Sequence, residues 1–235
     1  MPPIYHIHIR KTGGTTINHC FIAAMTGVPS EPIYDGLAKD EHNRLSIGGI
    51  GFAGWNKDTI SAGGWDYAFG HKPLEMLSLP ADAVLITCFR DPVARLASHY
   101  RMLREMIDDG SDHVIMEKEA PWASGSFRTF VDAVPDRHRL TQLYMFSTVL
   151  DLDEAGARLA RVDYVLWTEQ LADGLSSLAA ATGLPLAAGA HLRASTQFTI
   201  DAAELDYARE ALALEYAWLE RVRVTLSSGH CPASV

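Results

Sequence analysis

The segment H-I-R-K-T-G-G-T-T-I, from His8 to Ile17, contains the residue types that bind a phosphate group. Gly13 and Gly14 let backbone N–H groups approach an anion closely, and the two threonines that follow add hydroxyl donors. Lys11 adds a positive charge to the same loop. We therefore interpret the segment as a phosphate-binding loop, although short glycine motifs also occur in ordinary turns between a strand and a helix.

This loop differs from the loop of enzymes that use nucleoside triphosphates. Their pattern, G-x-x-x-x-G-K-[ST], places the lysine after the last glycine and before the hydroxyl that holds magnesium. Lys11 instead precedes both glycines. Because a lysine and backbone donors can bind a phosphate without a metal ion, we expect no metal requirement.

A second candidate anion site follows the apolar segment from Ala83 to Phe89. Arg90 comes next, and Asp91 and Pro92 then predict a helix start with an aspartate N-cap. Ser98 lies two turns further on, on the helix face of the aspartate. An arginine and a hydroxyl can bind a second phosphate, although a single arginine is more often a surface ion-pair residue.

The predicted elements that position these residues are those of one α/β domain spanning residues 1–235. The hydrophobic patterns predict strands at 4–9, 65–69, 83–89 and 164–167, and helices at 15–25, 92–107, 127–150, 153–160, 169–182 and from 201 onward. The stretch 30–64 is rich in glycine and polar residues, and we expect it to be irregular. Lys11 and Arg90 each follow a predicted parallel strand, so they should meet at one edge of the sheet.

Composition excludes several classes of function. A net charge of -9 argues against nucleic-acid binding over a broad surface. No apolar run approaches the roughly 20 residues of a membrane-spanning helix, so none is expected. The three cysteines form no C-x-x-C pair, which favours reduced thiols and a cytoplasmic protein. The oligomeric state is not determined by these patterns.

The two motifs K-T-G-G-T-T and C-F-R-D-P-V-A-R-L-A-S-H-Y resemble the sulfotransferases of the carbohydrate type that use 3'-phosphoadenosine 5'-phosphosulfate (PAPS). They are most similar to the uronyl and heparan sulfate 2-O-sulfotransferase branch. The resemblance implies a three-layer α/β sandwich, with a mainly parallel sheet between helices, of the P-loop-NTPase-like sulfotransferase fold. It also implies PAPS as co-substrate and a hydroxyl-bearing acceptor such as a glycan.

In that family the first motif binds the 5'-phosphosulfate, and the arginine and serine of the second bind the 3'-phosphate. The resemblance transfers these cofactor-binding roles to Arg10, Lys11, Thr12, Gly13, Gly14, Thr15, Thr16, Arg90 and Ser98.

Two further stretches resemble the same family. F-G-H, Phe69 to His71, matches the place where this branch has a catalytic histidine. H-L-R-A-S-T resembles a loop that closes over the cofactor, which implicates Arg193, Ser195 and Thr196. The four similar blocks cover about half of the chain and exclude residues 30–64 and 110–135. Because acceptor specificity would be built in those segments, the resemblance does not identify the acceptor.

His71 is the candidate general base on chemical grounds as well. The reference pKa of histidine, about 6.5, makes its side chain a proton acceptor near neutral pH. Gly70 gives the backbone freedom to orient it, just beyond a predicted strand. Lys11 would stabilise the negative charge that develops on the leaving phosphate, so both residues are predicted to be catalytic.

Other interpretations of these patterns are a P-loop kinase and a non-catalytic module that binds PAPS. His6 and His8 alternate as a metal pair would, but no third ligand is evident nearby. The run Arg137-His138-Arg139 is one that could contact an anionic acceptor, but a short charged run is usually a solvated helix face, and we interpret it as such. Trp122 is the tryptophan most suited to stacking on an acceptor, since it lies in an irregular segment.

Overall fold

The computed structural model describes residues 1–187 and 199–227, and its centre is a six-stranded sheet in the order β2-β3-β4-β1-β5-β6. The strands are β1 (Ile4–Ile7), β2 (Arg44–Ile47), β3 (Ile50–Gly54), β4 (Tyr67–Gly70), β5 (Val84–Phe89) and β6 (Tyr164–Trp167). From β3 to β6 all neighbours are parallel, and only the edge strand β2 runs antiparallel to its partner.

Helices and short 3-10 turns connect these strands. They are α1 (Gly14–Thr26), α2 (Glu31–Lys39), α3 (Lys57–Ala62), η1 (Leu74–Met76), α4 (Pro92–Asp108), α5 (Met116–Glu119), η2 (Ala120–Ala123), α6 (Phe127–Ala133), α7 (Asp136–Arg139), α8 (Thr141–Tyr144), α9 (Leu152–Leu159), η3 (Thr168–Gln170), α10 (Leu171–Thr182), α11 (Ala202–Ala211) and α12 (Ala213–Ser227). None of the helices in these described ranges is both long and apolar enough to cross a membrane.

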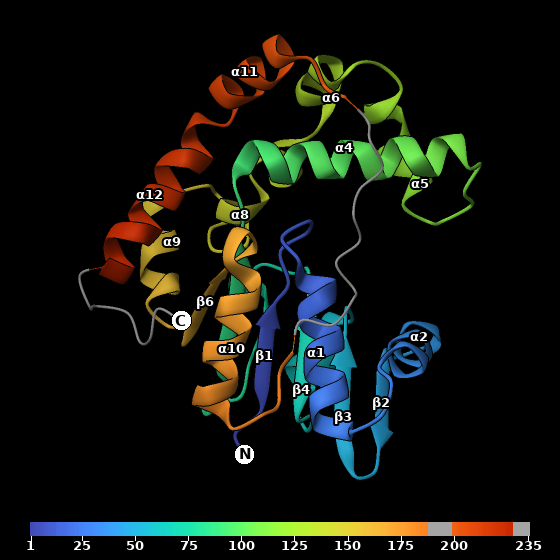
Figure 1. Cartoon of the computed structure of the whole chain (residues 1–235), viewed down its shortest axis with the longest axis vertical. Coiled ribbons are helices and arrows are strands. Elements are labelled where there is room, and N and C mark those ends of the chain that lie inside the picture. Colours follow the sequence, from blue (N-terminus) through green and yellow to red (C-terminus); the bar gives the residue numbers. More distant parts are fainter. Residues whose placement is uncertain (188–198, 228–235) are drawn as a thin grey trace.

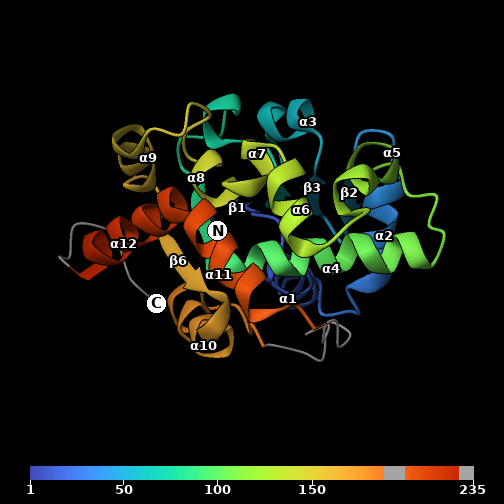
Figure 2. The ribbon, with the colours of Figure 1, turned by 90° about the horizontal axis from the view of Figure 1, so that it is seen from above.

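The sheet is the middle layer of three, as predicted. Helices α1 and α10 pack on one face, and α8, α9 and α12 pack on the other (Figures 1 and 2). Helix α4 runs across the carboxyl edge of the parallel strands and packs with α6 and α11 in a helical cap (Figure 1). The predicted fold class, a mainly parallel sheet flanked by helices, is therefore confirmed.

Central strand β1 explains why this sheet requires two helical layers. All four of its residues are buried, as expected for a parallel strand covered on both faces. Tyr5 and Ile7 pack with the layer of α9 and α12, whereas Ile4 packs with the layer of α1 and α10. By the same alternation, His6 and His8 point towards α1.

The prediction of an irregular segment at residues 30–64 is wrong. This stretch forms α2, the β2–β3 hairpin and α3. Its strands are four and five residues long and have four glycines in and beside them, so their local pattern is weak. Their strand conformation depends on pairing with β4, which a local pattern does not reveal.

The continuous helix predicted at 127–150 is also wrong, because the chain forms three short helices there. Val134 precedes Pro135 and has ψ 126°, the extended conformation that a following proline favours. Leu140, at φ -103° and ψ 39°, separates α7 from α8. The final predicted helix is likewise divided, at Leu212, into α11 and α12.

Candidate active site

The predicted phosphate-binding loop joins the end of β1 to the start of α1. Lys11 and Gly13 have left-handed backbones, with φ of 68° and 84°. Thr12 is buried, and its Oγ1 donates to the carbonyl of Ile9 at 3.0 Å. The Thr12 carbonyl accepts from Thr168 Oγ1 at 2.8 Å. The Thr12 hydroxyl therefore holds the loop in shape, while the N–H groups of the first turn of α1 favour an anion.

Gly14 is required by the packing of the loop against β1. A Cβ atom at this position would lie 1.9 Å from Cδ2 and 2.2 Å from Nε2 of His8. Both distances are far below a van der Waals contact. The glycine therefore allows the start of α1 to rest directly on the buried imidazole.

Arg90 reaches the same loop from the end of β5. Its NH1 donates to the carbonyl of Lys11 at 3.2 Å. Its backbone is held by Gln142, whose Oε1 accepts from the Arg90 N–H at 2.8 Å and whose Nε2 donates to the Arg90 carbonyl at 3.0 Å. Asp91 accepts from the Ala94 N–H at 2.8 Å, which confirms the predicted N-cap of α4.

A buried ionic pair stands behind Gln142. The Gln142 N–H donates to Glu215 Oε1 at 2.7 Å, and Arg95 Nε lies 3.8 Å from Glu215 Oε2. Neither charged side chain is exposed. Burial raises the pKa of Glu215, and the guanidinium of Arg95 opposes that shift. Gln142 thus connects Arg90 to a charged group inside the core.

We predict that Gln142→Leu destabilises the protein. A leucine side chain cannot bond the Arg90 backbone or replace the Gln142 Nε2 bond to Glu215 Oε2, although the backbone N–H of residue 142 still donates to Glu215 Oε1. Buried groups left without partners cost about 3 kcal/mol of unfolding free energy together. Gln170→Leu is the matched control, since that residue is exposed at the start of α10. Urea denaturation of both variants measures the loss. Equal stability of the two would contradict the structural role of Gln142.

His71 follows β4, as predicted, and lines the cavity described below. Its Nδ1 donates to the carbonyl of His8 at 2.6 Å, which leaves the lone pair of a neutral ring on Nε2. Burial lowers the pKa of His71 to about 4, so the ring is neutral at neutral pH. His71 therefore has the tautomer and charge state of a general base.

Arg10 is held above the loop by an acidic partner from α5. Its guanidinium binds Glu119 with two contacts, of 2.6 and 3.1 Å, and His99 Nε2 binds the same carboxylate at 2.9 Å. Burial alone would raise the pKa of Glu119, but the hydrogen bonds from His99 and Arg10 lower it to about 2. Cofactor binding by Arg10 stays a prediction, since this guanidinium already has a carboxylate partner.

Several neutral histidines make stability depend on pH. Burial lowers the pKa values of His6, His71 and His99 to about 4 each. Burial also lowers the pKa values of His8 and His138, so between about pH 4 and pH 6.5 the unfolded chain binds about five more protons than the folded chain. The stabilisation is complete above the unfolded pKa and is lost as pH falls towards 4.

The expected result is a free energy of unfolding, from urea titrations, that falls steeply from about pH 7 to pH 5. His42→Ala should leave this slope unchanged, because His42 is exposed. A flat profile would show that the buried rings are protonated in the folded protein.

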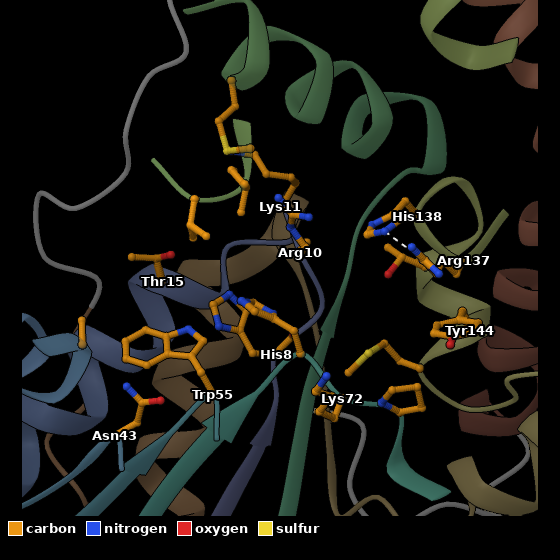
Figure 3. Close-up of a pocket in the computed structure, with 18 of the residues that line it drawn as sticks. His8, Arg10, Lys11, Thr15, Asn43, Trp55, Lys72, Arg137, His138 and Tyr144 are labelled. Carbon is orange, nitrogen blue, oxygen red and sulfur yellow. Dashed lines mark hydrogen bonds between the residues drawn. The ribbon is translucent and has the colours of Figure 1, made fainter. Parts of the chain in front are cut away.

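Of the residues above, His8, Arg10, Lys11 and His71 line a cavity of about 960 Å³ at the carboxyl edge of the sheet. Arg90 contacts the loop but is not among the described lining residues. Trp55 and Asn43 lie on one side of it, Arg137 and Tyr144 lie on the other, and His8 lies between them (Figure 3). The cavity is therefore large enough for a substrate and is bounded by the loop.

The charge of the cavity differs from that of the whole chain. Arg10, Lys11, Lys72 and Arg137 line it, and the described lining residues include no aspartate or glutamate. An anion can therefore approach this site although the protein has a net charge of -9. In the parts of the chain that the structure describes, no group of three or more His, Cys, Asp or Glu side chains is arranged to hold a metal ion.

Sequence reasoning missed part of this lining. Arg137 and His138 line the cavity and are joined by a hydrogen bond of 3.2 Å (Figure 3). Arg137 is exposed, as the prediction of a solvated helix face requires, but it also borders the cavity. Trp55 also lines it, with a left-handed φ of 48° that is unusual for a bulky residue. Trp122 packs instead beside His138, at 5.0 Å between ring centroids.

The remaining predicted residues have different positions. Thr15 lines the cavity, whereas Ser98 is half-buried on α4 and is not among the described lining residues. Arg193, Ser195 and Thr196 lie outside the described residues. The roles predicted for these residues, and for Thr16, stay predictions.

Comparisons with known proteins give a likeness to solved structures only. No family model and no curated protein matches the chain. Among solved structures, the chain is similar to the mouse sulfotransferase SULT7A1 complexed with PAP, with 13% sequence identity and a TM-score of 0.40. The match covers 93% of this chain and 65% of the mouse chain, so the chain spans just under two thirds of that protein.

Proposed function

We propose that this protein is a sulfotransferase that moves a sulfuryl group from PAPS to the hydroxyl of an acceptor. One observation supports this most strongly: two separate strand ends are hydrogen-bonded to the loop segment. Arg90 donates to the Lys11 carbonyl, and His71 donates to the His8 carbonyl. Arg90, a cation that can bind a phosphate, and His71, a base that can accept a hydroxyl proton, are thus both attached to the proposed anion-binding loop.

The proposed reaction is an in-line displacement at sulfur. The N–H groups at the start of α1 and the ammonium group of Lys11 bind the phosphosulfate. The acceptor oxygen forms a bond to sulfur as the bond from sulfur to the 5'-phosphate oxygen breaks. His71 Nε2 takes the acceptor proton, and the leaving electron pair stays on 3'-phosphoadenosine 5'-phosphate (PAP). The chemistry requires no metal ion.

Arg90 and Ser98 are proposed to bind the 3'-phosphate. Both residues belong to the unit formed by β5 and α4, and the backbone of Arg90 is fixed by Gln142. A fixed guanidinium loses little conformational freedom when it binds a phosphate. This arrangement supports recognition of a nucleotide that has phosphates on both the 3' and the 5' position of its ribose.

The acceptor is proposed to enter over β3 and β4, beside His71. Trp55 offers a flat face that suits a sugar or an aromatic ring, and Lys72 and Arg137 suit a negatively charged substituent. These features support a carbohydrate acceptor, as in the 2-O-sulfotransferase branch, and also a small acidic molecule. A kinase is disfavoured by the position of Lys11 ahead of the glycines.

Turnover of PAPS tests the proposal directly. The protein is incubated with PAPS and, in turn, with uronic-acid oligosaccharides, neutral sugars and phenols, and PAP release and sulfated product are measured by chromatography and mass spectrometry. Parallel reactions with ATP and magnesium test for a kinase. A sulfated product supports the proposal, whereas a phosphorylated product obtained only with ATP would replace it.

A further inference from the structure

Three imidazoles form a stack beneath the phosphate-binding loop, and the reaction above uses only one of them. The ring centroids of His6 and His8 are 5.1 Å apart with nearly parallel planes, and those of His8 and His71 are 4.4 Å apart. His8 is 5% exposed and lines the cavity. The role of this middle ring depends on which nitrogen holds its proton.

The hydrogen-bond network around Asn18 assigns that proton. Asn18 Oδ1 accepts from the Tyr67 hydroxyl at 2.8 Å and from His6 Nδ1 at 2.7 Å. Its Nδ2 therefore faces His8 Nδ1, at 3.2 Å, and donates to it. His8 Nδ1 is thus an acceptor, and the neutral ring holds its proton on Nε2.

The opposite orientation of the Asn18 amide fits less well. The amide nitrogen would then face His6 Nδ1, which would have to be bare, so the His6 proton would move to Nε2. That atom is buried and has no partner in the described part of the chain. A buried N–H without an acceptor is rarer in folded proteins than a buried acceptor without a donor.

The proton on His8 Nε2 faces the site where the anion would bind. A Cβ atom on Gly14 would lie only 2.2 Å from this nitrogen, so Nε2 adjoins the first turn of α1. Within residues 1–187 and 199–227, Nε2 makes no hydrogen bond. Burial holds the pKa of His8 well below its usual value, so the ring stays a neutral donor.

We propose that His8 is a second catalytic histidine, whose Nε2–H donates a hydrogen bond to an oxygen of the transferred sulfuryl group. This rests on the proposed function. The donor adjoins the backbone N–H groups of the loop on the side of His71, where the acceptor oxygen and the sulfur meet. Because Nδ1 is occupied by Asn18, His8 does not compete with His71 for the acceptor proton.

Two variants separate a donor from a packing role. His8→Phe keeps a ring in the stack but has no N–H, whereas His8→Gln places an amide N–H near the position of Nε2. Loss of one preorganised oxyanion donor lowers kcat about 100-fold, which we expect for His8→Phe. We expect His8→Gln to retain at least about one tenth of the wild-type kcat, because it restores the donor. PAPS conversion to PAP, with water or an identified acceptor, is the readout.

Two further measurements test the same assignment. Imidazole ¹⁵N NMR of the full chain should show His8 as the Nε2–H tautomer and His71 as the Nδ1–H tautomer. Calorimetry should give nearly the same Kd for PAP in wild type and in both variants, because PAP has no sulfuryl group.

The possible results distinguish the two proposals. If wild type binds no PAP and consumes no PAPS, the proposed function is wrong, and the role of His8 fails with it. If wild type is active but His8→Phe turns over as fast, or His8 is the Nδ1–H tautomer, only the inference about His8 is overturned.

Discussion

His71→Ala is expected to consume PAPS about 1,000-fold more slowly than the wild-type protein while binding PAP with the same affinity. Alanine removes the proposed base, and general bases contribute about 100-fold to 10,000-fold to such reactions. The hydrogen bond from His71 to the His8 carbonyl is also lost, but the loop keeps its bonds from Arg90 and Thr168.

His42→Ala is the matched control, because this exposed histidine lies outside the cavity lining. Its turnover should equal that of wild type. The pH profile gives an independent check: with a pKa of about 4 in the free protein, His71 stays neutral as pH falls until well below 6. kcat/KM should then decline only at lower pH, as protonation removes the base. Wild-type turnover in His71→Ala would exclude His71 as the base.

Gly14→Ala is expected to abolish PAP binding and to destabilise the fold by about 2 kcal/mol. The added methyl group would lie 1.9 Å from His8 Cδ2, and His8 is held between His6 and His71. Neither the ring nor the helix start can move without distorting the loop.

Gly156→Ala on α9 is the control, since no atom lies within 4 Å of a Cβ atom there. That variant should be unchanged or more stable by up to about 1 kcal/mol, because alanine favours a helix. Calorimetry with PAP and urea denaturation provide both readouts. Normal PAP affinity in Gly14→Ala would show that the loop does not bind the nucleotide.

The strand ends of this site could be predicted from the sequence because each one has a strong local pattern. Lys11 follows a buried β-branched strand and precedes two glycines, and Arg90 follows an apolar run and precedes an aspartate N-cap. His71 follows a strand and a glycine in the same way. Parallel strands align their carboxyl ends, so three local signals predict one shared edge.

The acceptor side of the cavity could not be predicted in this way. Trp55 follows β3, a strand that contains glycine and is defined by its pairing with β4. Arg137 belongs to a helix of four residues, whose charged sequence resembles any solvated helix face. Their places at the cavity result from long-range packing.

The buried ion pair that lies next to Gln142, and through it contacts the Arg90 backbone, could not be predicted from the sequence either. Arg95 and Glu215 are 120 positions apart in the numbering, and each interrupts an otherwise apolar helix face. A charged residue at such a position is usually exposed, so its pattern gives no reason to pair it with a distant partner. Only the fold brings the two charges together behind Gln142.

The central claim, that this site binds the PAPS nucleotide, is tested most directly by calorimetry with PAP and, separately, with ATP and magnesium. Wild type, Arg90→Ala and the control Arg161→Ala are compared, since Arg161 is exposed. We predict that wild type and Arg161→Ala prefer PAP, and that Arg90→Ala loses at least about 10-fold in PAP affinity. Preference for ATP with magnesium, or unchanged PAP binding by Arg90→Ala, would contradict the account.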